Sequence, residues 1–256
     1  MEYFSDPSVG AVAGNVKVGN ETGLLTRWQA LEYITSQNLD RRAFDLLNCI
    51  TVVPGAIGAF RKDDIVKVGG FTDDTLAEDC DLTIRLLRSG FGVRYASTAI
   101  ARTEAPETLR MFLKQRFRWS FGIMQCLWKH RDALFNSEYG ALGLVALPNT
   151  LLFQILLPFL SPLADVVMAV AIITGNGLQV LGYYLLFLLV DALGGIVAFS
   201  FEKEKLRRLW LLIPQRFSYR QIMYWVLFKS IVAALRGQLV GWGVLNRTGK
   251  VRNVPA

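Results

Sequence analysis

No lysine or arginine occurs between Arg131 and Lys203, although 28 of the 256 residues are basic. Residues 140–174 and 178–201 form two apolar runs in this interval. Each run is long enough to cross a bilayer, because one helical span needs about 20 apolar residues. A basic loop near 202–208 follows the second run, and basic loops favour the cytoplasmic side. The pattern excludes an entirely soluble globule and predicts a polar first half followed by a membrane-embedded second half.

The number of membrane spans stays open at three or four. Three prolines interrupt residues 140–174, which therefore form either one long broken helix or a tight pair. Residues 221–243 form a weaker span because two basic residues fall inside it, and charges are costly in hydrocarbon. The basic C-terminus favours the cytoplasm, so four crossings or a re-entrant last helix are expected.

The net charge and the cysteines indicate which ligands and binding partners are expected. The 28 basic and 21 acidic residues give a formal net charge of +7. In a chain with membrane spans, we interpret this excess as anchoring to the lipid bilayer rather than nucleic-acid binding. Cys49, Cys80 and Cys126 lack metal-ligand spacing and His130 is the only histidine, so no Cys/His zinc site is expected. Free thiols in a reducing compartment are expected instead.

The first half alternates between strand and helix patterns, which predicts an α/β fold. The expected strands are 8–18, 49–60 with a break at Pro54-Gly55, and 91–96. The expected helices are 24–46, a short one ending at Gly69-Gly70, and 82–88.

An acidic cluster precedes the last of these helices. Glu78 and Asp79 are followed by Cys80 and Asp81 at its start. Acidic residues favour helix N-termini, so plain capping is one interpretation. The other is a general base: a carboxylate in a loop at the end of a sheet, where catalytic groups are often placed.

A helix is expected from about residue 106 onward, and the spacing of its apolar residues predicts that it is amphipathic. Leu113, Phe117, Phe121, Met124 and Trp128 fall on one side at about 100° per residue. Such a helix belongs at a membrane surface or against a helical bundle, or else it is an ordinary core-facing helix.

The opposite side of that helix carries a second candidate site. Gln115, Arg118 and Trp119 lie side by side and offer an amide, a guanidinium and a flat aromatic ring. Arginine binds phosphate oxygens in a bidentate manner, and an indole stacks on a sugar ring, so the set suits a sugar diphosphate. The alternative is a basic interfacial helix with an aromatic belt residue.

Together these motifs make the chain resemble the C-terminal part of membrane-integrated family 2 glycosyltransferases, which include cellulose, chitin, hyaluronan and poly-N-acetylglucosamine synthases. Glu78-Asp79 is similar to the family's Thr-Glu-Asp motif, with Ala77 in place of threonine. Gln115–Trp119 is similar to its Gln-x-x-Arg-Trp motif. The segment 54–61, with Gly55 and Gly58, resembles an acceptor-side loop where a sugar approaches the backbone, and residues 241–249 also resemble bacterial members.

The resemblance implies a division into three regions. Residues 1–104 would be the C-terminal half of a GT-A domain, 105–138 interfacial amphipathic helices, and 139–256 a transmembrane helical region. It implies a multi-pass protein of the bacterial inner membrane with the α/β region in the cytoplasm.

The resemblance also implies inverting transfer of a sugar from a UDP-sugar donor to a growing polysaccharide acceptor. Glu78 and Asp79 would be catalytic, with Asp79 as the general base. Arg116 and Arg118 would neutralise the departing diphosphate. Gln115 and Trp119 would position the acceptor. Transfer of a single sugar to a lipid acceptor, or a non-catalytic membrane subunit, are the alternatives.

Full-length members of the family use Mg²⁺ or Mn²⁺, held by an Asp-x-Asp motif in a preceding nucleotide-binding half. That motif is not visible in this sequence, and no residue here is assigned to metal. We therefore expect a truncated fragment that is inactive alone and needs a missing N-terminal half or a partner subunit.

Overall fold

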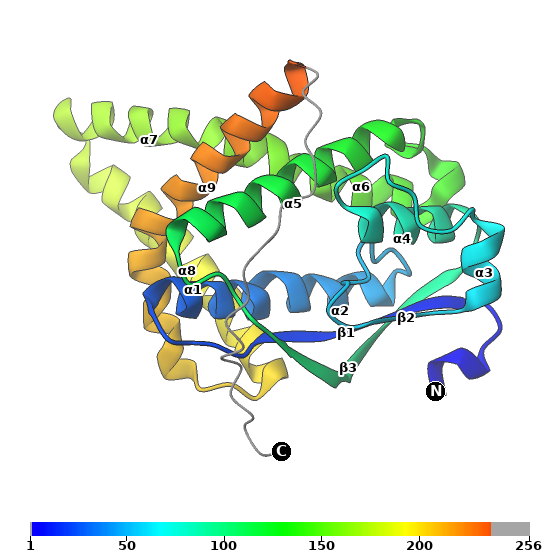
Figure 1. Ribbon diagram of the computed structural model, residues 1–256. Coiled ribbons are helices and arrows are strands. Elements are labelled where there is room, and N and C mark those ends of the chain that lie inside the picture. Colours follow the sequence, from blue (N-terminus) through cyan, green and yellow to red (C-terminus); the bar gives the residue numbers. More distant parts are fainter. Residues whose placement is uncertain (1, 237–256) are drawn as a thin grey trace.

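A mixed three-stranded sheet lies at the base of the molecule in the computed structural model, which describes residues 2–236 (Figure 1). The central strand β1 (Val9–Val18) pairs antiparallel with β2 (Gly58–Phe60) and parallel with β3 (Gly92–Thr103). Alanines and valines on β1 are buried, as small and β-branched residues in a pleated core strand should be. The strands expected at 8–18 and 91–96 are confirmed, and β3 is longer than predicted.

The strand expected over 49–60 is wrong in its first half. Only Gly58–Phe60 joins the sheet, whereas Ile50 and Val53 are buried without strand pairing. The N–H of Val53 donates to the Thr83 hydroxyl at 3.1 Å, so a helix side chain takes the place of a neighbouring strand. Pro54 then removes the next backbone donor.

The helix expected over 24–46 is confirmed, with one unpredicted feature. It consists of α1 (Leu24–Glu32), a π-helical turn at Tyr33–Asn38, and α2 (Leu39–Leu46). Asn38 at the end of this turn is fully buried and donates to the side chain of Asn15 on β1 at 2.8 Å. The widened turn thus fastens the helix to the sheet.

Two further helices match their predictions. Helix α3 (Lys62–Lys67) is followed by Gly69 and Gly70 with φ of 88° and 73°, values that favour glycine. Helix α4 (Glu78–Arg88) starts four residues earlier than expected, so the acidic cluster forms its first turn. Its buried Leu82 and Leu86 pack on the sheet.

Helix α5 (Leu109–Lys129) crosses above α1 and α4 in Figure 1. Phe117, Phe121 and Met124 of the predicted apolar side pack with Ala233 of α9, which confirms packing against other helices. Trp128, on the same side of the helix, lies outside this contact and is 71% exposed. Because α5 also packs on α1 and α4, its buried side includes residues outside that stripe, among them Arg116.

The run 140–174 forms one long helical rod rather than a pair. Its consecutive segments are η5 (Leu142–Ala146), α6 (Leu147–Asn149), η6 (Thr150–Leu156) and α7 (Leu157–Ile173). The segments η5 and η6 are π-helical, and local widening of this kind accompanies prolines within a helix. Helix α8 (Gly177–Glu202) follows.

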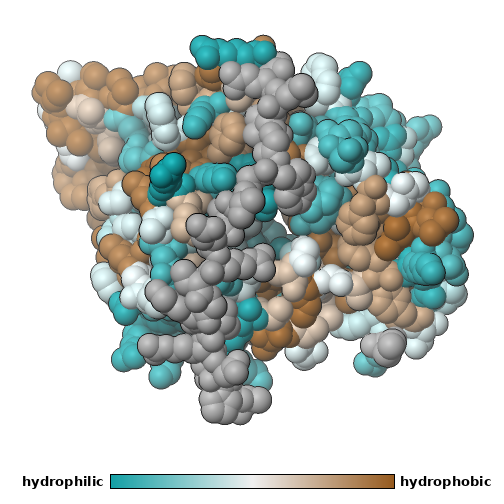
Figure 2. Space-filling model, viewed as in Figure 1, coloured by the Kyte–Doolittle hydropathy of each residue, from teal (hydrophilic) through white to brown (hydrophobic). Residues whose placement is uncertain are grey.

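Within residues 2–236, two helices are long and apolar enough to cross a membrane: Leu142–Ile173 and α8. Figure 2 shows a mostly hydrophobic surface over α7, at the upper left. Helix α9 (Leu212–Leu235) does not pass the same test. The further span predicted at 221–243 extends past the described residues, and the motif at 241–249 lies entirely outside them.

The remaining described segments are short. They are η1 (Glu2–Ser5), η3 (Arg131–Ala133), η4 (Ser137–Tyr139) and η7 (Leu206–Leu211). Cys49, Cys80 and Cys126 are buried free thiols, as expected.

Candidate functional site

Asp79 lies in the first turn of α4 and faces the loop at Gly55. Its carboxylate accepts hydrogen bonds from the N–H of Cys80 at 2.8 Å and of Gly55 at 3.4 Å. Burial raises the pKa of Asp79 above its ordinary value, while these two donors oppose the shift. A partly buried carboxylate with a raised pKa is suited to accept a proton.

The capping interpretation of the acidic cluster holds in part. The N-cap residue of α4 is Ala77, which makes no side-chain cap, and Glu78, Asp79 and Asp81 occupy the first turn. Their charges interact favourably with the helix dipole. Asp81 is fully buried and binds Arg85, Lys129 and His130, so it is a structural residue.

Helix α5 meets this turn at an unusually close crossing. A Cβ built on Gly122 would lie 2.8 Å from both the Cβ and the backbone N of Ala77. The Gln125 side-chain oxygen accepts from the N–H of Leu76 at 2.8 Å. Neither Gly122 nor Gln125 was predicted to be a functional residue from the sequence. A glycine inside an amphipathic helix was the one sequence feature that could have indicated the close helix crossing.

Across this crossing, the charge of Arg118 acts on Glu78. Burial raises the pKa of Glu78, the neighbouring Asp79 raises it further, and the positive charge of Arg118 opposes both. The two motifs that the sequence singled out therefore share one electrostatic environment, although 40 residues of chain separate Glu78 from Arg118.

Gln115 and Trp119 lie on the same stretch of α5. The Trp119 ring packs beside Tyr33, with ring centroids 6.5 Å apart, and joins a cluster that includes Val16 and Ile57. The side-chain oxygen of Gln115 is buried without a hydrogen-bond partner among the described residues. An unsatisfied acceptor of this kind can receive a hydroxyl donor.

Arg116 points elsewhere. Its side chain is 4% exposed, and Nη1 donates to Glu32 of α1 at 2.6 Å. Its guanidinium also lies over the rings of Phe112 and Trp119. The structure therefore places Arg116 in a buried ion pair with Glu32, whereas the charge of Arg118 acts on Glu78.

The two predicted glycines differ in what surrounds them. A Cβ at Gly55 would meet nothing within 4 Å, so the backbone beside Asp79 is open to a ligand. A Cβ at Gly58 would lie 2.6 Å from Val53 Cγ1. Packing therefore accounts for Gly58, which leaves Gly55 as the glycine beside the carboxylate.

Sequence reasoning missed Arg41 of α2. This residue is 8% exposed, its Nη1 donates to the Asn38 side-chain oxygen at 3.2 Å, and its charge acts on Asp79. A single basic residue within a predicted helix does not indicate that its charge will act on a carboxylate elsewhere in the chain. The cation helps to keep Asp79 ionised in its buried position.

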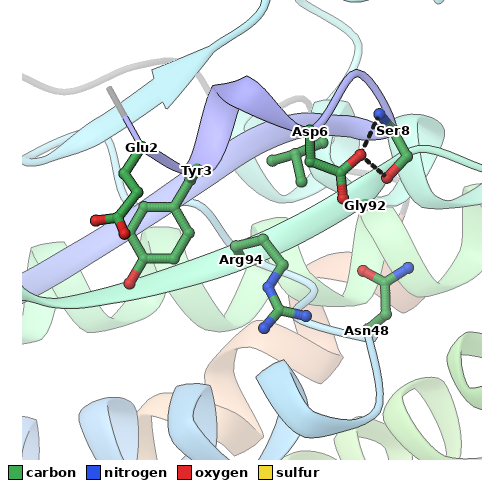
Figure 3. A pocket seen from close by; sticks show the side chains of 8 residues that line it. Glu2, Tyr3, Asp6, Ser8, Asn48, Gly92 and Arg94 are labelled. Atoms are coloured by element: carbon green, nitrogen blue, oxygen red, sulfur yellow. Dashed lines mark hydrogen bonds between the residues drawn. The ribbon is translucent and has the colours of Figure 1, made fainter.

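Two cavities lie away from these residues. Figure 3 shows Asp6, Asn48 and Arg94 bordering one of about 630 Å³ near the start of β1. The other, of about 360 Å³, lies between α7, α8 and α9 and includes Glu32 and Tyr219 in its lining. Neither contains Asp79 or Arg118.

Among residues 2–236, no group of three or more His, Cys, Asp or Glu side chains is arranged to hold a metal ion. The described part of the chain does not fit the divalent cation implied by the family, so no chemical step here is assigned to metal.

Comparison with known sequences decides the family. The family model of glycosyl transferase family group 2 matches residues 1–242. The chain belongs to this family. The resemblance found in the motifs is thereby confirmed, and the chain is a glycosyltransferase by family.

Curated relatives agree. A poly-β-1,6-N-acetyl-D-glucosamine synthase of Staphylococcus aureus (strain COL) is 32% identical over 123 residues, which cover 48% of this chain and 30% of the synthase. The probable glycosyltransferase YdaM of Bacillus subtilis (strain 168) is 34% identical over 137 residues, covering 53% of this chain and 33% of YdaM. The matched segments thus span about a third of each relative.

A solved structure supports the glycosyltransferase fold. It is the mannosyltransferase PcManGT from Pyrobaculum calidifontis in complex with GDP-Man and Mn²⁺, with a TM-score of 0.54 and 18% identity. The match covers 93% of this chain and 57% of the mannosyltransferase. The mixed sheet and the helices around it therefore belong to a known glycosyltransferase architecture.

Proposed function

We propose that this glycosyltransferase chain contributes the acceptor side of an inverting transfer from a UDP-sugar to a growing polysaccharide. The observation that carries the proposal is the crossing of Gly122 over Ala77, which packs the helix that carries Arg118 against the turn that carries Glu78 and Asp79. The charge of Arg118 acts on Glu78 across this crossing. A displacement at an anomeric carbon needs a base on one side and stabilisation of negative charge on the other.

Each residue then has a separate task. Asp79 accepts the proton of the acceptor hydroxyl, and Glu78 and Arg41 set the electrostatic environment in which it does so. The Gly55 N–H helps to orient the carboxylate. Arg118 stabilises the departing diphosphate, while the free oxygen of Gln115 and the Trp119 ring bind the acceptor sugar.

The proposed setting is the cytoplasmic face of the bacterial inner membrane. The helical rod Leu142–Ile173 and helix α8 supply two spans, and the apolar window of the first is 0% buried within the structure. Residues 1–104 form the GT-A part, 105–138 pack between it and the spans, and the remainder holds the protein in the bilayer. The loop near 202–208 supplies basic groups on the cytoplasmic side.

The test is product formation by the gene product that carries this chain, reconstituted in lipid with radiolabelled UDP-sugars. We expect a ladder of polymer that is lost in Asp79→Asn, with UDP-sugar binding retained. A single lipid-linked band would instead favour transfer to a lipid acceptor. Equal turnover by the wild type and Asp79→Asn would exclude Asp79 as the base. If the gene product shows no turnover while a separate synthase is active, the result would favour a non-catalytic subunit.

A further inference from the structure

Glu32, the last residue of α1, uses both carboxylate oxygens to join two other helices. Oε1 accepts from Arg116 of α5 at 2.6 Å. Oε2 accepts from the hydroxyl of Tyr219 on α9. The Glu32 side chain thus links α1, which lies over the sheet, to α5, which carries the Gln115–Trp119 segment, and to α9, which packs beside the apolar spans.

The surroundings of Arg116 make this link tight. Its guanidinium lies 5.0 Å from the centroid of the Phe112 ring and 4.6 Å from that of Trp119. Tyr219 packs on Phe112 with ring centroids 5.1 Å apart. Nε and Nη2 of Arg116 have no hydrogen-bond partner in the described structure, so Glu32 is its principal polar partner. The carboxylate therefore neutralises a cation that is nearly removed from water.

We infer that Glu32 is a positioning residue for the sugar transfer: by holding Arg116 and Tyr219, it fixes the Gln115–Trp119 segment relative to the bundle. Arg116 lies inside that segment, so its ion pair sets the rotation of α5 about its axis. That rotation decides where Gln115, Arg118 and Trp119 point. The inference rests on the proposed function for its kinetic consequence, but not for its structural one.

The same geometry assigns different tasks to the two arginines of the motif. The charge of Arg116 is balanced by Glu32, whereas that of Arg118 acts on Glu78 at the proposed centre. Arg116 would thus position the segment, and Arg118 would act on substrate. Tyr219 extends the link to α9 and to the 360 Å³ cavity beside it. A displacement of α9 would therefore change the position of α5.

The experiment uses Glu32→Gln, Glu32→Asp and Tyr219→Phe in the lipid-reconstituted gene product. Asp64→Asn is the control, because Asp64 of α3 is also an acid held in ion pairs, with Lys67 of α3 and with Arg61 just before that helix. Its side chain is 2% exposed and that of Glu32 is 21% exposed, so the control removes the more buried of the two charges. Hydrogen–deuterium exchange is followed in residues 109–119 and, for comparison, 78–88. Donor KM and kcat are measured on the same samples.

We expect Glu32→Gln to accelerate exchange in 109–119 but not in 78–88, and to lower kcat by about 100-fold, since misplacing reacting groups by about 1 Å has that cost. Donor KM should change by less than about threefold, because donor binding is not the step affected. Tyr219→Phe should act in the same direction but more weakly, and Glu32→Asp should restore part of kcat. Asp64→Asn should leave 109–119 unchanged.

Unchanged exchange in 109–119 for both Glu32→Gln and Tyr219→Phe would overturn the inference, even if the wild type proved inactive and the proposed function failed. A loss of donor affinity with kcat preserved would also overturn it, because Arg116 would then be contacting the donor. If Glu32→Gln does not fold, Tyr219→Phe alone decides through the same exchange measurement.

Discussion

Gly122 of α5 crosses Ala77 so closely that a Cβ on the glycine would lie 2.8 Å from the backbone N of the alanine. Ala77 immediately precedes Glu78 and Asp79, and Gly122 lies one helical turn beyond Arg118. No other residue type can occupy position 122 without moving one of the two backbones. The distance between the proposed base and the proposed diphosphate-binding arginine therefore depends on position 122 being a glycine, which has no side chain.

Gly122→Ala is predicted to destabilise the protein by about 1–3 kcal/mol, the usual cost of overpacking, and to reduce transfer. The matched control is Gly182→Ala in α8, where an added Cβ meets nothing within 4 Å. In a helix interior that change should be neutral or stabilising by up to about 1 kcal/mol. Thermal unfolding in detergent measures both, and equal melting temperatures for the two variants would contradict the role given to the crossing.

Local patterns predicted much of the fold. The helix over 24–46 and the strands at 8–18 and 91–96 follow from periodicity and from the glycines that end them, and both candidate motifs were found by residue type and spacing. The alanines and valines of β1 allow few alternatives to a buried strand.

Long-range partners were not predictable in the same way. Arg116 looked equivalent to Arg118 because both are basic residues of one motif, yet Arg116 binds Glu32, 84 residues earlier in the chain. Such a choice depends on how helices cross, which periodicity does not encode. The exposure of Trp128 has a related cause, since the apolar stripe of α5 extends beyond the stretch that α9 covers.

The pH dependence of transfer should follow Asp79. Because burial raises the pKa of its carboxyl, the ionised base is lost at a higher pH than for an exposed aspartate. The rate kcat should therefore rise with pH through the acid limb and then level. Removing the nearby cation in Arg41→Met should move that limb to higher pH, whereas Arg102→Met, on β3, should leave it in place. An acid limb at the same pH in both variants would exclude Arg41 as a partner of the base.

A second, half-buried carboxyl, that of Asp40, should govern stability rather than activity. Burial raises the pKa of Asp40 to about 6, with Arg41 opposing the shift. The folded state thus binds this proton more tightly than the unfolded state, whose aspartate titrates near 3.9. The contribution of Asp40 to stability is present below about pH 4 and is lost as pH rises to about 6.

Asp40→Asn should therefore raise the melting temperature at pH 8, and this gain should shrink at pH 5 and vanish near pH 4. Asp63→Asn removes an exposed acid of α3 and should have little effect at any of these values. Melting curves at the three pH values provide the measurement. A gain for Asp40→Asn that does not vary with pH would show that the partly desolvated charge of Asp40 is not its cause.

Glu202, the last residue of α8, should be the main attachment of that apolar helix to the sheet. Its side chain is 3% exposed; it accepts from Asn15 of β1 at 2.7 Å and pairs with Arg42 of α2 at 2.8 Å. Glu202→Ala leaves the arginine without its carboxylate and should destabilise the protein by about 3–5 kcal/mol. Glu204→Ala, two residues on and 25% exposed, removes a second glutamate paired with Lys17 and should cost at most about 1 kcal/mol. Chemical unfolding in micelles compares the two, and a similar loss for both would mean that burial of Glu202 contributes nothing to the attachment.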